Sequence, residues 1–172
     1  MKTRLLLTVL VSLLALSGCF TPKGYFDLVT LVQPVVTSEV TTAAAGEYVE
    51  VTVTSGVSLP SLSGRAEEDY WYRVGICLVR QAPPLPFESC NTDLPIVVPE
   101  GLELAEGDSL SHAGEVTVLR GQTVTLTHRV RFTASAPVDV TAIGLHYSLG
   151  SSGGIGGVIY SLEEQRVTVT FN

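Results

Sequence analysis

The clearest pattern in the sequence is an alternation of apolar and polar residues, which is typical of strands that bury one face. The segment Thr123–Thr133 shows it best, because apolar residues and one histidine share a face while threonines and arginines share the other. The positions on the apolar face are Val124, Leu126, His128, Val130 and Phe132. Shorter runs of the same period, also rich in β-branched residues, occur at 48–54, 116–118 and 167–171. Each run predicts a β-strand.

Two further runs, 70–79 and 138–149, are apolar on both faces and therefore predict central strands. An early strand is expected within 26–36, cut by Pro34. The break at Arg120–Gln122 lies between two alternating segments, so we expect a hairpin there. Seven or more short strands without a helical stripe predict an all-β domain, an immunoglobulin-like or Greek-key β-sandwich. A small closed barrel fits the same pattern, and the pattern leaves the strand order open.

The first residues have the order of an export signal. Lys2 and Arg4 precede an apolar run from Leu5 to Leu16, and small residues then precede Cys19. The apolar run is shorter than the ~20 residues that a permanent transmembrane helix needs. An ordinary cleaved signal with a chance cysteine would show much of this pattern too.

The segment Leu16-Ser17-Gly18-Cys19 resembles the lipobox of bacterial lipoproteins. That resemblance implies removal of residues 1–18 and acylation of the Cys19 sulfur. Two or more acyl chains anchor a protein stably, because each buried CH₂ contributes about 0.8 kcal/mol. Residues 19–25 are then the lipidated cysteine and a short tether, and residues 26–172 are the β-sandwich domain. Phe20 stands where an Asp signals inner-membrane retention in this family, so the outer membrane is favoured over the inner.

Charge and cysteine content add two constraints. The chain has 17 acidic and 10 basic residues, a net charge of −7 that becomes −9 once Lys2 and Arg4 leave with the signal. Such an acidic chain argues against nucleic-acid binding and against anionic lipid head groups. With Cys19 assigned to lipid, Cys77 and Cys90 remain as a pair, which predicts a disulfide in an oxidising compartment. Two reduced cysteines are the alternative.

His112, His128 and His146 are the candidate metal ligands, since imidazole suits both copper and zinc. The tract 150–159, which follows His146, is similar to the glycine-rich loop and next strand of copper/zinc superoxide dismutases. That resemblance implies a histidine-bound copper site on a Greek-key sandwich. The sequence departs from the family pattern, because the H-x-H copper pair, the loop arginine and the zinc-loop histidines have no match. Alternatively, His128 is a hydrogen-bonded core residue and the other two histidines are incidental.

The cluster Tyr70-Trp71-Tyr72 is a candidate platform for a sugar or a protein partner. In a strand Tyr70 and Tyr72 share a face and Trp71 takes the other, so we expect one of these faces to be core. A tryptophan buried in a central strand is the alternative, since sandwiches commonly have one.

Two functions remain from the sequence. The first is a non-enzymatic envelope lipoprotein, held to the membrane by its lipid anchor, that binds a surface-layer, outer-membrane or cell-wall partner without a cofactor. It is favoured because catalytic motifs are sparse: the tract 150–154 matches G-x-S-x-G, yet no helix and no later histidine follow it. The alternative is an extracytoplasmic copper enzyme of superoxide dismutase type.

Overall fold

The computed structural model describes residues 30–80, 90, 96–151 and 157–172, and these residues are almost entirely β-strand. The strands are β1 (Thr30–Thr37), β2 (Thr42–Ala43), β3 (Val49–Ser58), β4 (Glu67–Arg80), β5 (Leu102–Leu104), β6 (Ser111–Leu119), β7 (Thr123–Ala134), β8 (Val138–Gly150), β9 (Gly157–Tyr160) and β10 (Val167–Phe171). A 3₁₀ turn, η2 (Glu163–Gln165), precedes β10. The signal segment, Cys19 and the tether lie outside the described residues.

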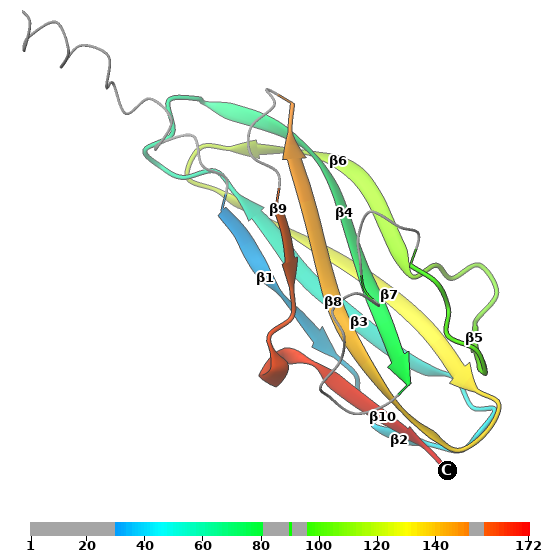
Figure 1. Ribbon diagram of the computed structural model, residues 1–172. Helices are drawn as coiled ribbons and strands as arrows, with labels where there is room; N and C mark the ends of the chain where they lie inside the picture. Colours follow the sequence, from blue (N-terminus) through cyan, green and yellow to red (C-terminus); the bar gives the residue numbers. More distant parts are fainter. Residues whose placement is uncertain (1–29, 81–89, 91–95, 152–156) are drawn as a thin grey trace, which may run out of the picture.

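The strands form two sheets packed as a β-sandwich, with the order β1-β3-β7-β5 in one and β2-β10-β8-β4-β6 in the other (Figure 1). Strand β9 pairs with β8, and only β2 and β10 run parallel among the pairs of the described chain. The order β1-β3-β7 facing β6-β4-β8-β10 matches strands A-B-E and C′-C-F-G of immunoglobulin-like domains. The sandwich prediction is therefore confirmed.

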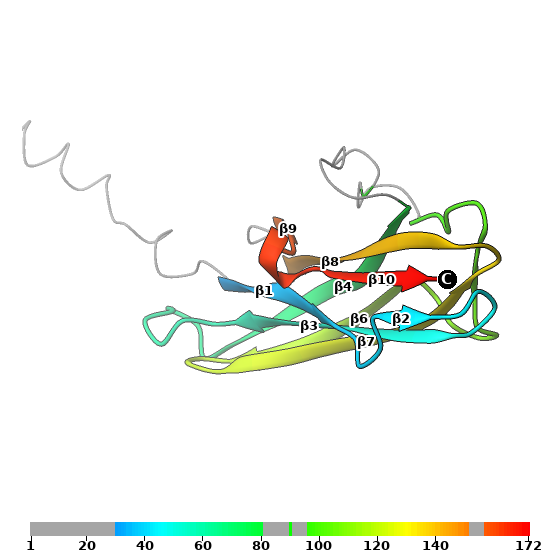
Figure 2. The same cartoon turned by 90° about the horizontal axis from the view of Figure 1, so that it is seen from below.

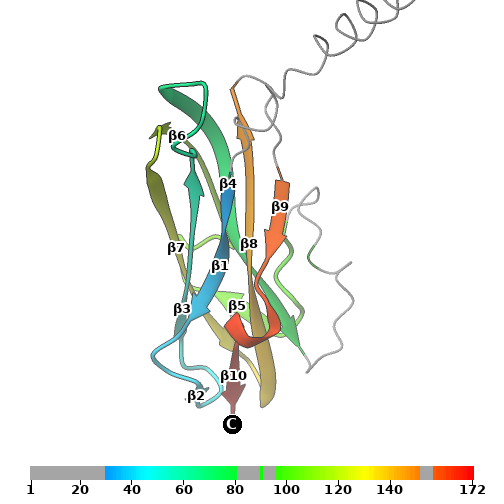
Figure 3. The ribbon, with the colours of Figure 1, turned by 90° about the vertical axis from the view of Figure 1, so that its left-hand side faces the viewer.

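The predicted central strands β4 and β8 lie side by side inside the larger sheet, and the sheets form separate layers (Figures 2 and 3). Alternate residues of each strand point into the space between the layers. Valines dominate the inner face of β3, and Phe132 of β7 meets Phe171 of β10 edge to face at 5.7 Å. The fully buried inner residues include Val51, Val53, Val74, Ile76, Val118, Val130, Phe132, Val140 and Val169. This burial is what the period-two pattern predicted.

The expected hairpin at Arg120–Gln122 is wrong. Strands β6 and β7 flank this turn, but β6 pairs with β4 while β7 pairs with β3, so the turn crosses from one sheet to the other. Gly121 has a φ of 75°, and its amide donates to the carbonyl of Leu59. The tight turn was identified correctly, but turn chemistry does not specify whether the flanking strands pair.

The sequence pattern predicts that Pro34 cuts the first strand, but β1 continues through it. It lies at a bulge where the register of β1 against β3 shifts between Val32 and Val35, a place where a missing N–H is tolerated. The Pro34 carbonyl accepts a hydrogen bond from Ser161, which also bonds to Gly144 of β8. A Cβ on Gly144 would lie within 2.9 Å of Pro34, Val53 and Ser161, so glycine permits this close approach.

The predicted disulfide between Cys77 and Cys90 is present, with a Cα–Cα distance of 5.7 Å. Cys77 faces outward from β4, and both cysteines belong to a small buried cluster with Ile143 and Leu145 on the outer face of β8. Ile96 packs against the same cluster. This cover explains why β4 and β8 are apolar on both faces: one face meets the other sheet, and part of the other is covered by Cys90 and Ile96.

Replacing both cysteines by alanine should lower the free energy of unfolding by about 3 kcal/mol, because a cross-link over 13 positions restricts the unfolded chain. Urea titration of the oxidised protein, the reduced protein and the double variant measures the difference. An unfolding midpoint that does not change on reduction would contradict this prediction.

Candidate functional site

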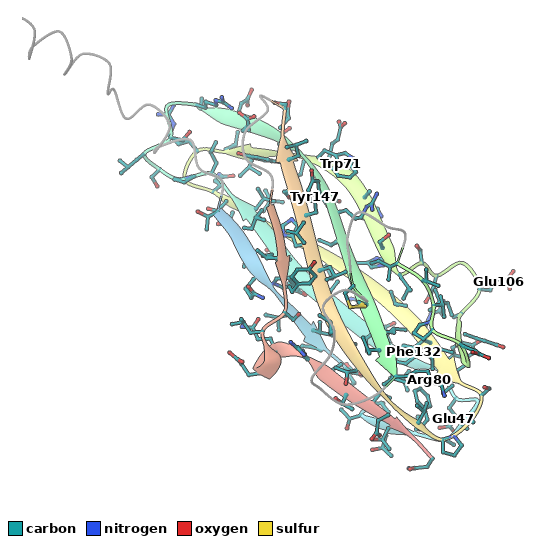
Figure 4. All side chains as sticks on the ribbon, in the orientation of Figure 1. Glu47, Trp71, Arg80, Glu106, Phe132 and Tyr147 are labelled. Carbon is teal, nitrogen blue, oxygen red and sulfur yellow. A yellow bond between two sulfur atoms is a disulfide. The ribbon has the colours of Figure 1, made fainter. Side chains whose placement is uncertain are left out.

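The most distinctive exposed feature of the described chain is an aromatic surface on the outer face of β4 and β8. We call Trp71, Arg73, Tyr147 and Leu149 the aromatic face. Trp71 pairs with Leu149 and Arg73 pairs with Tyr147 in the β4–β8 register, so all of them project from the same side of the sheet. Trp71 is 38% exposed and Leu149 41% exposed, which is unusual for large apolar side chains on central strands. Figure 4 shows Trp71 and Tyr147 close together in this part of the sheet.

The side chains of the aromatic face hold one another in place. The rings of Trp71 and Tyr147 meet edge to face with centroids 5.5 Å apart. The guanidinium of Arg73 lies 5.7 Å from the centre of the Trp71 ring, a cation–π distance. Val158 of β9 pairs with Tyr147 and extends the surface, whereas Glu115 of β6 pairs with Trp71 and begins an acidic border. The arrangement is a preorganised apolar centre with a cation above it and carboxylates at its side.

The predicted cluster Tyr70-Trp71-Tyr72 is divided by the sheet. Tyr70 is 2% exposed and belongs to the core, and Tyr72 packs partly buried beside it on the inner face. Only Trp71 contributes to the aromatic face, as the alternation had allowed. Its real neighbour Tyr147 comes from β8, and no local sequence signal could identify it, because cross-strand neighbours depend on register.

His146 lies in the core and links the two sheets. Its side chain is fully buried, with Nδ1 2.7 Å from the Ser55 hydroxyl of β3 and Nε2 2.7 Å from the Ser148 hydroxyl. The Ser55 hydroxyl donates to the carbonyl of Val32, so it accepts from the His146 Nδ1–H. Nε2 then accepts from Ser148. A neutral imidazole satisfies every partner in this chain of hydrogen bonds.

This network is structural in character. Burial lowers the pKa of His146 to about 4, and its contact with the Val32 backbone only partly opposes that effect. The Ser55 hydroxyl gives its proton to a carbonyl instead of to the imidazole, so His146 does not activate it as a base. Ser148 does direct its proton at the ring, but it is 1% exposed and no substrate reaches it there.

His112 and His128 lie together at the open side of the sandwich, where β6 of one sheet approaches β7 of the other. Their ring centroids are 6.1 Å apart and the ring planes differ by 20°. The Nε2–H of His128 donates to the Ser109 carbonyl at 2.7 Å. Burial lowers the pKa of His128 and the neighbouring His112 adds to the lowering, while the bond to Ser109 opposes it.

The three predicted metal ligands therefore do not converge. His112 and His128 are neighbours, but both ring nitrogens of His146 are engaged by serines inside the core. In the described part of the chain, no group of three or more His, Cys, Asp or Glu side chains is placed to hold a metal ion. The glycine-rich tract compared with superoxide dismutases lies partly outside the described residues, although 157–160 do form a strand.

Comparison with known proteins adds no identification. The chain matches no known family of proteins, and no curated protein resembles it closely enough to count as a match. Within the ranges that the structure describes, no helix has the length and apolarity of a membrane span. The geometry of the chain's own residues therefore carries the functional argument.

Acidification should destabilise the protein through His146. The unfolded histidine binds a proton near pH 6.5 but the folded one only near pH 4, so the unfolded state takes up more protons between these values. The contribution of His146 to the free energy of unfolding is therefore fully present above about pH 6.5. It is lost as the pH falls, by about 2 kcal/mol between pH 7 and pH 5. Urea titrations at several pH values measure it.

The control for this prediction is His146→Gln, which removes the titration and keeps a hydrogen-bonding side chain. Its stability should change less between pH 7 and pH 5 than that of the wild type. The lowered pKa of His128 leaves a residual slope of the same sign. The lowered pKa of Asp108 acts only below its ordinary value of 3.8, outside this window. An unchanged slope in His146→Gln would show that another group causes the loss.

Proposed function

We propose that this protein is a lipid-anchored, non-enzymatic component of a bacterial cell envelope that binds a protein partner through the aromatic face. The observation that carries the proposal is the exposed pair Trp71 and Leu149 beside Tyr147 and Arg73 on a rigid sheet. Tryptophan, tyrosine and arginine are the residue types that dominate binding energy at protein interfaces.

The position and charge of this surface support a particular kind of partner. Trp71 and Tyr147 lie in the half of the sandwich where β1 begins, away from the C-terminus (Figures 1 and 4). Thr30 is 11 positions after Cys19, so the chain between them can span at most roughly 40 Å. The outer face also carries the exposed carboxylates Asp69 and Glu115. A partner with an apolar centre and basic surroundings, itself near the membrane, is complementary to this surface.

Loss of the anchor should release the protein. In Cys19→Ala the acyl acceptor is gone, so the chain should leave the detergent-soluble membrane fraction while the sandwich still folds. Fractionation followed by immunoblotting shows the redistribution, and mass spectrometry of the native N-terminal peptide shows the acyl chains on Cys19. An intact leader or an unmodified Cys19 in native material would refute the lipoprotein part of the proposal.

Truncating Trp71 should weaken partner binding strongly. Trp71→Ala truncates the central side chain and should weaken binding by about 2 kcal/mol or more, roughly thirtyfold, as for interface hot spots. The measurement is quantitative co-purification of the tagged full chain with envelope proteins after in-cell cross-linking, followed by titration with the captured partner.

The matched control is Tyr48→Ala, which removes an aromatic side chain that is 53% exposed immediately before β3, a strand of the other sheet. Circular dichroism and urea unfolding establish that both variants fold. Equal capture of the same partner by Trp71→Ala and the wild type would exclude the aromatic face. Equal losses in Trp71→Ala and Tyr48→Ala would place the interface elsewhere.

A further inference from the structure

The histidine pair on the open side of the sandwich has the features of a small metal site. His112 is opposite Val74 in the β4–β6 register and His128 is opposite Val53 in the β3–β7 register. Val74 and Val53 are fully buried inner-face residues, so both histidines also start from the inner faces of their strands. Because β6 and β7 are at the same side of the two sheets, the rings meet where the inner space opens to solvent.

One ring of the pair is already oriented as metal-binding histidines are. A carbonyl oxygen only accepts hydrogen bonds, so the 2.7 Å contact with Ser109 fixes the proton of His128 on Nε2. Its Nδ1 then keeps the lone pair that binds a metal. Histidine ligands almost always donate their second N–H to a carbonyl, a carboxylate or water in this way, which fixes both tautomer and ring orientation.

The second ring is accessible, and no hydrogen bond joins it to another described residue. His112 is exposed, and its contacts within the described residues are with the rings of Tyr72 and His128. The nearby carboxylate of Asp108 is engaged by the backbone N–H and the guanidinium of Arg131. Its oxygens already accept hydrogen bonds from Arg131, so we take the two imidazoles as the ligands.

We propose that His112 and His128 together bind one divalent transition-metal ion, with Cu²⁺ preferred over Zn²⁺ and water completing the coordination. The two rings are stacked with centroids 6.1 Å apart. A metal binds in the plane of an imidazole ring, so the exposed His112 side chain would turn to bring one nitrogen to the ion beside His128, at about 2.0–2.1 Å from each nitrogen. The preference for copper follows from the affinity order of divalent metals at nitrogen ligands. The ion would bridge the two sheets, since each sheet supplies one ligand.

Titration of the full chain, purified in detergent without a histidine tag, with CuCl₂ in a non-coordinating buffer tests the proposal. We expect one copper per chain, an electron paramagnetic resonance spectrum with two coordinated nitrogens, and a higher unfolding midpoint with metal. His112→Ala and His128→Ala should each weaken binding at least about tenfold. Zn²⁺ should bind at the same residues with lower affinity.

Glu115→Ala, also on β6, is the control and should leave copper binding unchanged. His112 is exposed, so His112→Ala is a secure test even if His128→Ala fails to fold. Copper binding that survives in His112→Ala, or no stoichiometric binding by the wild type, would overturn the proposal. Trp71→Ala should retain the copper site, which separates this inference from the proposed partner binding.

Discussion

The hydrogen bond between Ser55 and His146 ties one sheet to the other inside the core. Apolar packing alone tolerates sliding between two sheets, because it is non-directional. A fully buried imidazole does not tolerate such sliding, because leaving either nitrogen unpaired would cost about 1–3 kcal/mol. Ser55 is on β3 and His146 on β8, the strands that correspond to B and F, which a disulfide joins in antibody domains. Here a neutral hydrogen-bond chain occupies the corresponding inter-sheet position.

This arrangement of the core determines where function can be. The inner faces are occupied by apolar side chains and the serine–histidine network, and Cys90 and Ile96 cover part of the outer face around Ile143 and Leu145. Further along the same strands Trp71 is exposed and Tyr147 is partly exposed. Trp71 and Tyr147 therefore continue an outer surface of which the part around Ile143 and Leu145 is buried.

The sequence predicts individual strands well and the relations between strands poorly. Alternation identified the inner face of β7 residue by residue, and apolarity on both faces identified β4 and β8 as central. The turn at Arg120–Gln122 was misassigned to a hairpin, because turn residues specify a reversal and not the sheet to which the next strand belongs. The pairing of Trp71 with Tyr147 and the distance of His146 from the other histidines both depend on register between distant strands, which no local pattern contains.

The three histidines show how one residue type acquires different roles from its place in the sandwich. All of them start from inner faces, but His146 is on a central strand and His112 and His128 are on strands at the open side. In the centre, desolvation keeps the ring neutral and serines take both of its nitrogens. At the open side, water reaches the rings and lone pairs remain for a ligand. A metal bound there would join the same two sheets that His146 joins in the core, so occupancy would be coupled to the stability of the sandwich and separate from the aromatic face.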